Sequence, residues 1–89
     1  MIVRIDKSFA KDLSKINDKK LRSKVADCIE AVQHAKRISE IRDLKKLKGS
    51  NYYYRIKISN YRIGLVIDNN MADFVRFLHR KDIYKFFPK

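Results

Sequence analysis

Basic side chains alternate with apolar ones on two neighbouring stretches of the sequence, and these basic residues are the ones best suited to chemistry. Arg55 and Lys57 lie on the first stretch, and Arg62 lies on the second. Ser59-Asn60 separates the stretches, which is the spacing of a two-residue β-hairpin turn. Such a turn places Lys57 directly opposite Arg62. Like charges in that position repel each other, so the pair predicts a bound anion.

These side chains suit the chemistry of an RNA phosphate. The guanidinium groups of Arg55 and Arg62 can form paired hydrogen bonds with phosphate oxygens, and Lys57 can act as a point charge or as a base. When the attacking group is the 2′-hydroxyl of the RNA itself, the protein mainly has to stabilise the charge that develops at the phosphorus. Cationic residues with Tyr53 would equally suit a surface that binds nucleic acid without cutting it. The residues alone leave cutting and binding open.

The chain has few side chains suited to the other common kinds of catalytic or binding site. The glutamates, Glu30 and Glu40, lie in the expected helical part of the chain, so paired-carboxylate catalysis has little support. His34 and His79 are far apart in sequence and have no accompanying acidic or cysteine cluster, so we expect no metal site. The two glycines cannot form a glycine-rich phosphate loop, and we expect no cofactor. Cys28, the single cysteine, is expected to be a small buried apolar residue.

The charge of the chain indicates a polyanionic partner. Its 89 residues include 22 Lys and Arg against 10 Asp and Glu, which gives a formal charge of +12. Nucleic acid or an acidic protein would relieve this repulsion. Charged residues follow directly after Met1-Ile2-Val3, which argues against a secretory signal, and no window approaches the roughly 18 apolar residues of a membrane helix. We expect one cytoplasmic domain over residues 1–89, with no membrane partner.

The elements that hold the basic residues are predicted to form an α+β fold. Ile2 to Ile5 reads as a strand, and Ser8 is placed to cap a helix with apolar residues at i, i+4 and i+7. Asp18 is placed to cap a second helix, from Lys19 to about Ala35. The two helices form a hairpin that covers one side of a sheet. A short helical stretch and an extended lead-in follow within residues 36–49.

The hairpin strands have one apolar face and one basic face. The apolar face consists of Tyr54, Ile56, Ile58, Tyr61, Ile63, Leu65 and Ile67. The opposite face carries the basic residues together with Tyr53 and Gly64. Gly64 is expected opposite Arg55, where the missing side chain leaves space for a ligand.

A third strand, Met71 to His79, completes a three-stranded antiparallel meander. With a three-residue turn at 68–70, Val75 and Phe77 point inward, and Arg76 lies next to Arg62. In that register the charged side also holds Phe74, Leu78 and Arg80. A two-residue turn would put Arg76 into the core, which the cost of burying an unpaired charge opposes. Residues 81–88 form a short C-terminal helix or turn.

Four motifs in this order resemble one known family. They are L-K-K-L-K-G at 44–49, Y-R-I-K-I at 54–58, N-Y-R-I-G at 60–64 and F-L-H-R-K-D-I-Y at 77–84. Together they are similar to the RelE/ParE superfamily of bacterial type II toxins, over nearly the whole chain. The resemblance implies a RelE-like fold. It also implies a ribosome-dependent endonuclease that cuts mRNA in the decoding site without metal or cofactor, and an antitoxin encoded beside it.

The resemblance also implies roles for individual residues. Arg55 and Lys57 match the two basic positions before the hairpin turn of RelE-like toxins. Arg62 matches the arginine assigned to transition-state stabilisation. Lys81 falls where RelE-like toxins carry a second functional arginine, and Arg80 lies beside it.

Further site residues are expected at the C-terminal end and around the basic face. Tyr84 is the nearest match to a C-terminal tyrosine of the RelE-like active site, whereas ungapped counting reaches Phe87. His79 is a candidate base, although it also matches a structural histidine at a strand end. Candidate RNA-binding residues are Lys45, Lys46, Lys48, Tyr53 and Arg76. The simplest interpretation of the lysines among them is a solvated face, and the second is the rim of a nucleic-acid groove.

Two other functions remain open on the same fold. ParE-like members inhibit DNA gyrase and generally lack this cationic set, so retention of Arg55, Lys57 and Arg62 favours the RNA-cutting branch. A toxin that binds RNA or the ribosome without cutting is the third interpretation. In each case the expected protein partner is an acidic, amphipathic antitoxin.

Overall fold

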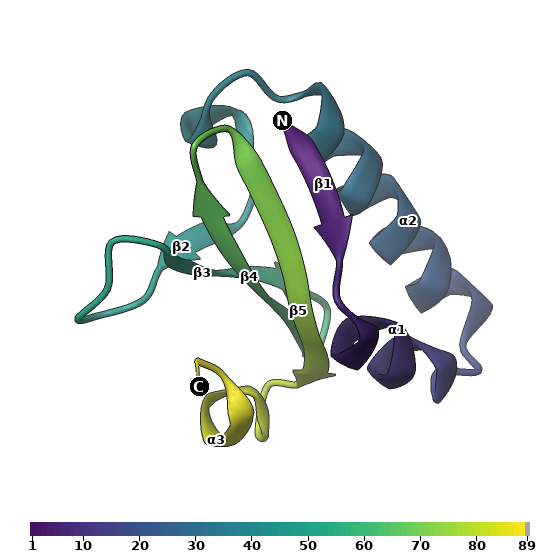
Figure 1. Cartoon of the computed structure of the whole chain (residues 1–89). Helices are drawn as coiled ribbons and strands as arrows, with labels where there is room; N and C mark the ends of the chain where they lie inside the picture. Colours follow the sequence, from purple (N-terminus) through teal and green to yellow (C-terminus); the bar gives the residue numbers. More distant parts are fainter. Residues whose placement is uncertain (89) are drawn as a thin grey trace.

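The chain folds into one sheet with two longer helices on one side. A computed structural model describes residues 1–88. Its elements are β1 (Ile2–Ile5), α1 (Lys7–Ser14), α2 (Lys19–His34), a 3₁₀ turn η1 (Ile38–Glu40), β2 (Leu44–Lys46), β3 (Tyr53–Ile58), β4 (Tyr61–Asp68), β5 (Met71–His79) and α3 (Ile83–Phe86). Figure 1 shows α1 and α2 together beside the sheet, and α3 apart from them near the end of β5.

The sheet confirms the predicted α+β class and adds one strand to it. Its order is β1-β5-β4-β3-β2, with β1 parallel to β5 and the other neighbours antiparallel. The N-terminal strand, the helical pair, the meander and the short C-terminal helix are all present. The expected extended lead-in is itself a strand, β2, which pairs with β3 and gives the sheet five strands.

Only one of the two predicted helix caps is present. The Asp18 carboxylate accepts hydrogen bonds from the backbone N–H groups of Lys20 (2.9 Å) and Leu21 (3.1 Å), as expected at the start of α2. The prediction for Ser8 is wrong, because α1 begins directly after Asp6 and Ser8 lies inside the helix. The Ser8 hydroxyl is used elsewhere, at the edge of β5.

Side chains of α1 replace β1 as hydrogen-bond partners of β5. The pairing between β1 and β5 ends at Phe74. Beyond that point the Ser8 hydroxyl donates to the Val75 carbonyl (2.6 Å), and an Asp12 carboxylate oxygen accepts from the Phe77 N–H (3.0 Å). These bonds satisfy strand-edge groups that the short β1 does not reach.

The turn before β5 and the register of β5 differ from the prediction. The turn has two residues, Asn69 and Asn70, both with positive φ (49° and 62°), which suits a tight hairpin. A register shift then places Leu65 opposite Phe74 and Gly64 opposite Arg76, so the alternation of faces changes once along the strand. The register shift keeps Arg76 out of the core even with the two-residue turn.

The core lies between the sheet and the helices α1 and α2. The predicted apolar face of β3 and β4 is buried, with Tyr61 half-buried at its end. Because of the register shift, both Phe74 and Phe77 point into this core, so the outward prediction for Phe74 was wrong. Phe9 of α1 packs edge-on against Phe74, with ring centroids 5.5 Å apart. Each such ring contributes roughly 1.5–3 kcal/mol on burial.

Phe87 covers Gly64 on the opposite face of the sheet. A Cβ atom at Gly64 would lie 2.6 Å from the Phe87 ring, which is only 3% exposed. The ring also packs against Tyr53, with centroids 5.7 Å apart. The space that the sequence assigned to a ligand above Gly64 is therefore filled by the C-terminal segment of the chain itself.

Within residues 1–88, no helix is long and apolar enough to cross a membrane. The described residues also contain no group of three or more His, Cys, Asp or Glu side chains that could hold a metal ion. Cys28 is half-buried on α2, and burial, together with the nearby Asp43 carboxylate, raises the pKa of its thiol to about 11. Such a thiol stays protonated at neutral pH.

Candidate active site

The register of the sheet aligns basic residues in two rows on the face away from α1 and α2. Residues directly opposite each other share a face. Lys45 pairs with Arg55, which pairs with Gly64, and Gly64 pairs with Arg76. The second row is Lys57, Arg62 and Leu78. The four basic residues Lys45, Arg55, Lys57 and Arg62 form the cationic face.

Asp43 binds Arg55 and Lys57, the two residues of the cationic face that lie on β3. Its carbonyl accepts hydrogen bonds from the Arg55 guanidinium (2.9 Å) and from the Lys57 backbone N–H (3.3 Å). The backbone of Asp43 has a φ of 60°, which turns its carbonyl toward β3 at the start of β2. Because guanidinium has five donor groups, Arg55 keeps most of its capacity for a ligand.

Arg62 is fixed by the hairpin turn that precedes it. One terminal nitrogen of its guanidinium donates to the carbonyls of Ser59 (3.1 Å) and Tyr61 (2.9 Å). The side chain is half-buried, while that of Lys57 opposite is exposed. The hairpin therefore presents a held guanidinium beside a freely solvated ammonium group, which is an arrangement suited to a phosphate.

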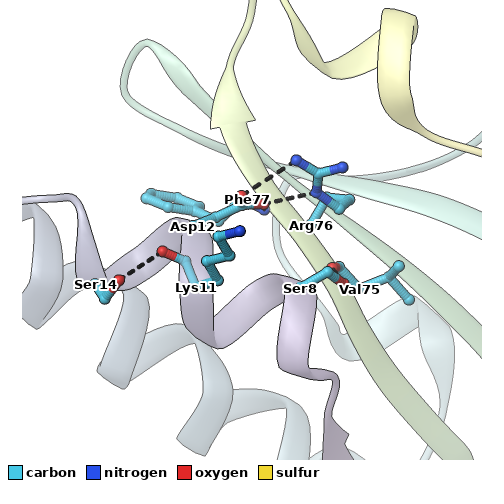
Figure 2. A network of polar contacts seen from close by, with 7 residues as sticks. All are labelled: Ser8, Lys11, Asp12, Ser14, Val75, Arg76 and Phe77. Atoms are coloured by element: carbon cyan, nitrogen blue, oxygen red, sulfur yellow. Dashed lines mark hydrogen bonds and ion pairs between the residues drawn. The ribbon is translucent and has the colours of Figure 1, made fainter.

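Arg76 lies on the same side of the sheet but is bound within the protein. Its Nε donates to Asp12 Oδ2 at 2.7 Å and its Nη2 donates to Asp12 Oδ1 at 3.2 Å, as Figure 2 shows. The Asp12 side chain is 7% exposed and that of Arg76 is 25% exposed. The guanidinium carbon of Arg76 also lies over the Phe86 ring, 5.4 Å from the ring centroid. The assignment of Arg76 to RNA binding remains a prediction.

Sequence reasoning missed Asp12. It lies in α1 between the two apolar residues Phe9 and Leu13, which both pack against the core. A carboxylate on the apolar stripe of a helix is itself a signal, because burying an unpaired charge is costly. Such a carboxylate requires a cationic or hydrogen-bonding partner, although the sequence alone does not identify the partner.

The three lysines around β2 are not brought together. Lys45 lies on the cationic face, since it pairs with Arg55, whereas Lys46 pairs with Tyr54 and lies on the opposite face. Lys48 follows β2 in the loop before β3. Tyr53 is half-buried on the same side of the sheet as Arg55.

The residues after β5 form a corner beside the hairpin turn. The Arg80 backbone N–H donates to the Asn60 carbonyl at 2.8 Å. The side chains of Arg80 and Lys81 are exposed. Tyr84, on α3, is 60% exposed. These three side chains are thus available at one end of the sheet.

His79 faces the helix side of the sheet. It pairs with Tyr61, whose ring stacks on the buried Phe77 ring at 5.0 Å between centroids. The imidazole lies against Tyr61, and its Nδ1 accepts from the Lys81 backbone N–H at 3.2 Å. The structure does not bring His79 onto the cationic face.

A carboxyl pair lies at the other end of β5, away from the hairpin turn. Burial raises the pKa of Asp73 to about 6, with further contributions from a hydrogen bond and charge repulsion with Asp6, and Arg4 opposes the shift. Arg4 is the residue that pairs with Asp73 across β1 and β5. One Asp73 carboxyl oxygen is buried without a hydrogen-bond partner. No local pattern in the sequence predicts this pair.

Comparison with known proteins identifies the family of this chain. A family model described as the ParE toxin of the type II toxin-antitoxin system, parDE, matches residues 3–84. Toxin RelE3 of Methanocaldococcus jannaschii is 39% identical over 89 residues, covering 99% of this chain and 100% of the relative.

Solved structures agree with this match. A chain of the RelB-RelE antitoxin-toxin complex from Methanococcus jannaschii superimposes with a TM-score of 0.80 at 38% identity, over 96% of this chain and 99% of that chain. The archaeal RelE-RelB complex from Pyrococcus horikoshii OT3 shares the fold, with a TM-score of 0.74 at 19% identity, over 92% and 97% of the two chains. The chain therefore belongs to the RelE/ParE superfamily and is a toxin of the type II toxin-antitoxin class.

Proposed function

We propose that this toxin is a metal-independent endoribonuclease that cuts mRNA on the ribosome and so stops translation in the cytoplasm. One observation carries the proposal. Arg55, Lys57 and Arg62 lie side by side on one face of the β3–β4 hairpin, and the other face of that hairpin is buried in the core. A rigid pair of strands keeps the three cations at fixed spacing, which electrostatic catalysis requires.

The proposed reaction is a transesterification within the RNA. The 2′-oxygen forms a bond to phosphorus while the bond from phosphorus to the 5′-oxygen of the next nucleotide breaks. The 2′-hydroxyl loses a proton, and the leaving 5′-oxygen gains one. The products are a 2′,3′-cyclic phosphate and a 5′-hydroxyl, and no metal ion enters the balance.

Each cation has a distinct part in this reaction. Arg62 and Arg55 donate hydrogen bonds to the non-bridging phosphate oxygens, where negative charge increases in the transition state. Lys57 is the candidate base, a role that its side chain performs only as the neutral amine. It shares the face of the two arginines, whereas His79 lies on the other side of the sheet. Arg80 and Lys81 add positive charge at the end of the strands. Tyr84 is a candidate proton donor to the leaving oxygen.

Inhibition of DNA gyrase is the second candidate function, and the match to the ParE toxin model favours it. Against it, the relatives that are 38–39% identical carry the name RelE. A DNA supercoiling assay with purified gyrase separates the two. The gyrase hypothesis expects loss of supercoiling activity with intact mRNA. The nuclease hypothesis expects normal supercoiling activity with cut mRNA.

We also propose a cognate acidic antitoxin as the protein partner. The similar chain from Methanococcus jannaschii was solved in complex with RelB. The formal charge of +12 favours an acidic partner that covers basic surface. Ribosomes and mRNA are polyanions that would attract the same surface.

The test of the nuclease is a brief induction followed by mapping of transcript 5′ ends. We expect new ends within translated codons for the wild type, and none for Arg62→Ala. Lys20→Gln is the matched control, because it removes one exposed charge on α2, and it should cut like the wild type. Growth arrest with intact transcripts would contradict the proposal and would favour gyrase inhibition or a ribosome block without cutting.

A further inference from the structure

The ion pair of Asp12 and Arg76 is the most buried charged contact among residues 1–88, and it joins α1 to β5. Asp12 comes from α1 and binds β5 twice, through the Arg76 guanidinium and through the Phe77 N–H. Figure 2 shows the carboxylate lying between the helix and the strand. The fork-like contact and the added backbone bond give the planar guanidinium one defined orientation.

That orientation puts the guanidinium next to the C-terminal segment. The Arg76 guanidinium carbon lies 5.4 Å from the centre of the Phe86 ring, a cation–π distance. Arg76 also pairs across the sheet with Gly64, and Gly64 is the residue under the Phe87 ring. Arg76 is therefore adjacent to both aromatic residues at the end of α3.

Three apolar side chains attach the segment to the sheet together with Arg76. α3 has only four residues, so it cannot be stable as an isolated helix. Besides the buried side chain of Ile83, two rings link it to the sheet. Phe86 lies at Arg76, and Phe87 lies over Gly64 and against Tyr53 of β3. Arg76 therefore adds one oriented contact to the two buried anchors, Ile83 and Phe87, that place the segment on the cationic side of the sheet.

We infer that Asp12 and Arg76 are positioning residues, which hold α3 and Phe87 against the sheet beside the cationic face, and that Arg76 is not itself an RNA ligand. The first part concerns this chain alone. The second part rests on the proposed function. Asp12 thereby influences the site from α1, on the opposite side of the sheet, without touching RNA.

Nuclear magnetic resonance tests the first part without any RNA. The Phe87 ring over Gly64 should shift the Gly64 Hα resonances and give a nuclear Overhauser contact between ring and Hα protons. Asp12→Asn keeps an acceptor for the Phe77 N–H but removes the charge that orients Arg76. We expect it to weaken this contact and move the Gly64 Hα shifts toward their random-coil values, while the methyl resonances of Ile63 and Leu65 stay unchanged.

Arg76→Lys is the second variant, because it keeps the positive charge beside Asp12 and loses the planar fork. It should give the same changes at Gly64 as Asp12→Asn. A full Gly64–Phe87 contact in the two variants would overturn the inference. General loss of dispersion in one variant would indicate unfolding, and the decision then rests on the other variant.

The salt dependence of RNA binding tests the second part. Affinity for a short fluorescein-labelled single-stranded RNA is measured by anisotropy at several salt concentrations. Loss of one phosphate ligand should reduce the slope of log affinity against log salt by about 0.7. We expect this reduction for Lys45→Gln, which lies in the same row and is exposed, and an unchanged slope for Arg76→Gln.

The outcomes separate the inference from the proposed function. A slope that falls equally for Arg76→Gln and Lys45→Gln would make Arg76 a ligand and overturn the second part. If the wild type does not bind the RNA, the proposed function loses its support, and the resonances of Gly64 still decide whether Asp12 and Arg76 position the C-terminal segment.

Discussion

Arg62 is anchored before any ligand binds, since two carbonyls of the hairpin turn hold one of its terminal nitrogens. A donor fixed in advance needs little reorganisation in the transition state, and for that reason it stabilises the developing charge more than a mobile one. Lysine at this position would keep the charge but lose the fork that reaches both the turn and a phosphate. The charge alone is not expected to be sufficient.

We therefore predict that Arg62→Lys lowers the rate of RNA cleavage on ribosomes by about 10²-fold. Arg22→Lys is the matched control, because one nitrogen of Arg22 also binds two carbonyls, those of Leu13 and Ile16, but on the helical side. Both variants should lose a similar, small amount of unfolding free energy in urea. Equal losses of cleavage in the two variants would show that the effect is one of stability.

Gly64 is expected to tolerate no larger side chain. Its Cα must lie directly under the Phe87 ring, since an added Cβ would come within 2.6 Å of ring carbons. Gly64→Ala should lower the unfolding free energy by about 1–3 kcal/mol, the usual cost of overpacking. Measuring Gly64→Ala again in a Phe87→Ala background checks the cause, because the extra methyl group should then cost almost nothing. An unchanged cost there would contradict the proposed contact.

Contacts could be predicted from the sequence when the interacting residues lie close together along the chain. Local patterns were sufficient for the β3–β4 hairpin, where the pairing of Lys57 with Arg62 is confirmed, and for the Asp18 cap. The contact between Asp12 and Arg76 spans 64 positions and follows from how α1 meets β5. The sequence therefore predicted that Lys57 and Arg62 lie opposite each other, but not that Arg76 is paired with Asp12.

Among the elements, β5 determines which side chains lie in the core and which lie on the cationic side of the sheet. Its register shift brings two aromatic residues, Phe74 and Phe77, to the core and leaves Arg76 outside. Strict alternation along the strand could not predict this, because one extra residue reverses the faces. The short β1 leaves half of the β5 edge to α1, and that is why Asp12 and Ser8 bind it.

The pairing of β1 with β5 makes stability depend on pH. The pKa of Asp73 is about 6 in the folded chain against an ordinary value of 3.8, so the folded state binds the proton more tightly. The resulting stabilisation is complete below pH 3.8 and is lost as the pH rises through about 6. Above that pH, Asp73 and Asp6 repel each other beside a partly buried edge.

We predict that Asp73→Asn raises the urea midpoint at pH 8 and changes it little at pH 4. The amide cannot ionise, so the variant should show a smaller fall in midpoint between these two values of pH than the wild type. Asp68→Asn is the control at the exposed end of β4. An identical pH profile for the wild type and Asp73→Asn would rule out the shifted pKa.

The net positive charge of the chain opposes its compact folded state. A formal charge of +12 on 89 residues raises the energy of the compact state, because like charges are brought closer together. Where α1 meets β5 this repulsion is avoided, since the half-buried Arg76 has the buried Asp12 as its partner. The remaining exposed cations are the part of the charge that a polyanion can neutralise.

This balance predicts that salt stabilises the isolated toxin. Raising ionic strength from about 0.01 M to about 0.15 M shortens the Debye length from roughly 30 Å to roughly 8 Å, which screens repulsion between exposed cations. The buried pair of Asp12 and Arg76 is screened much less, so its contribution is kept. We expect the thermal midpoint to rise with potassium chloride, and to rise further with a polyanion such as heparin at constant salt. A midpoint that falls over this range would mean that attraction between charges, and not repulsion, dominates the folded surface.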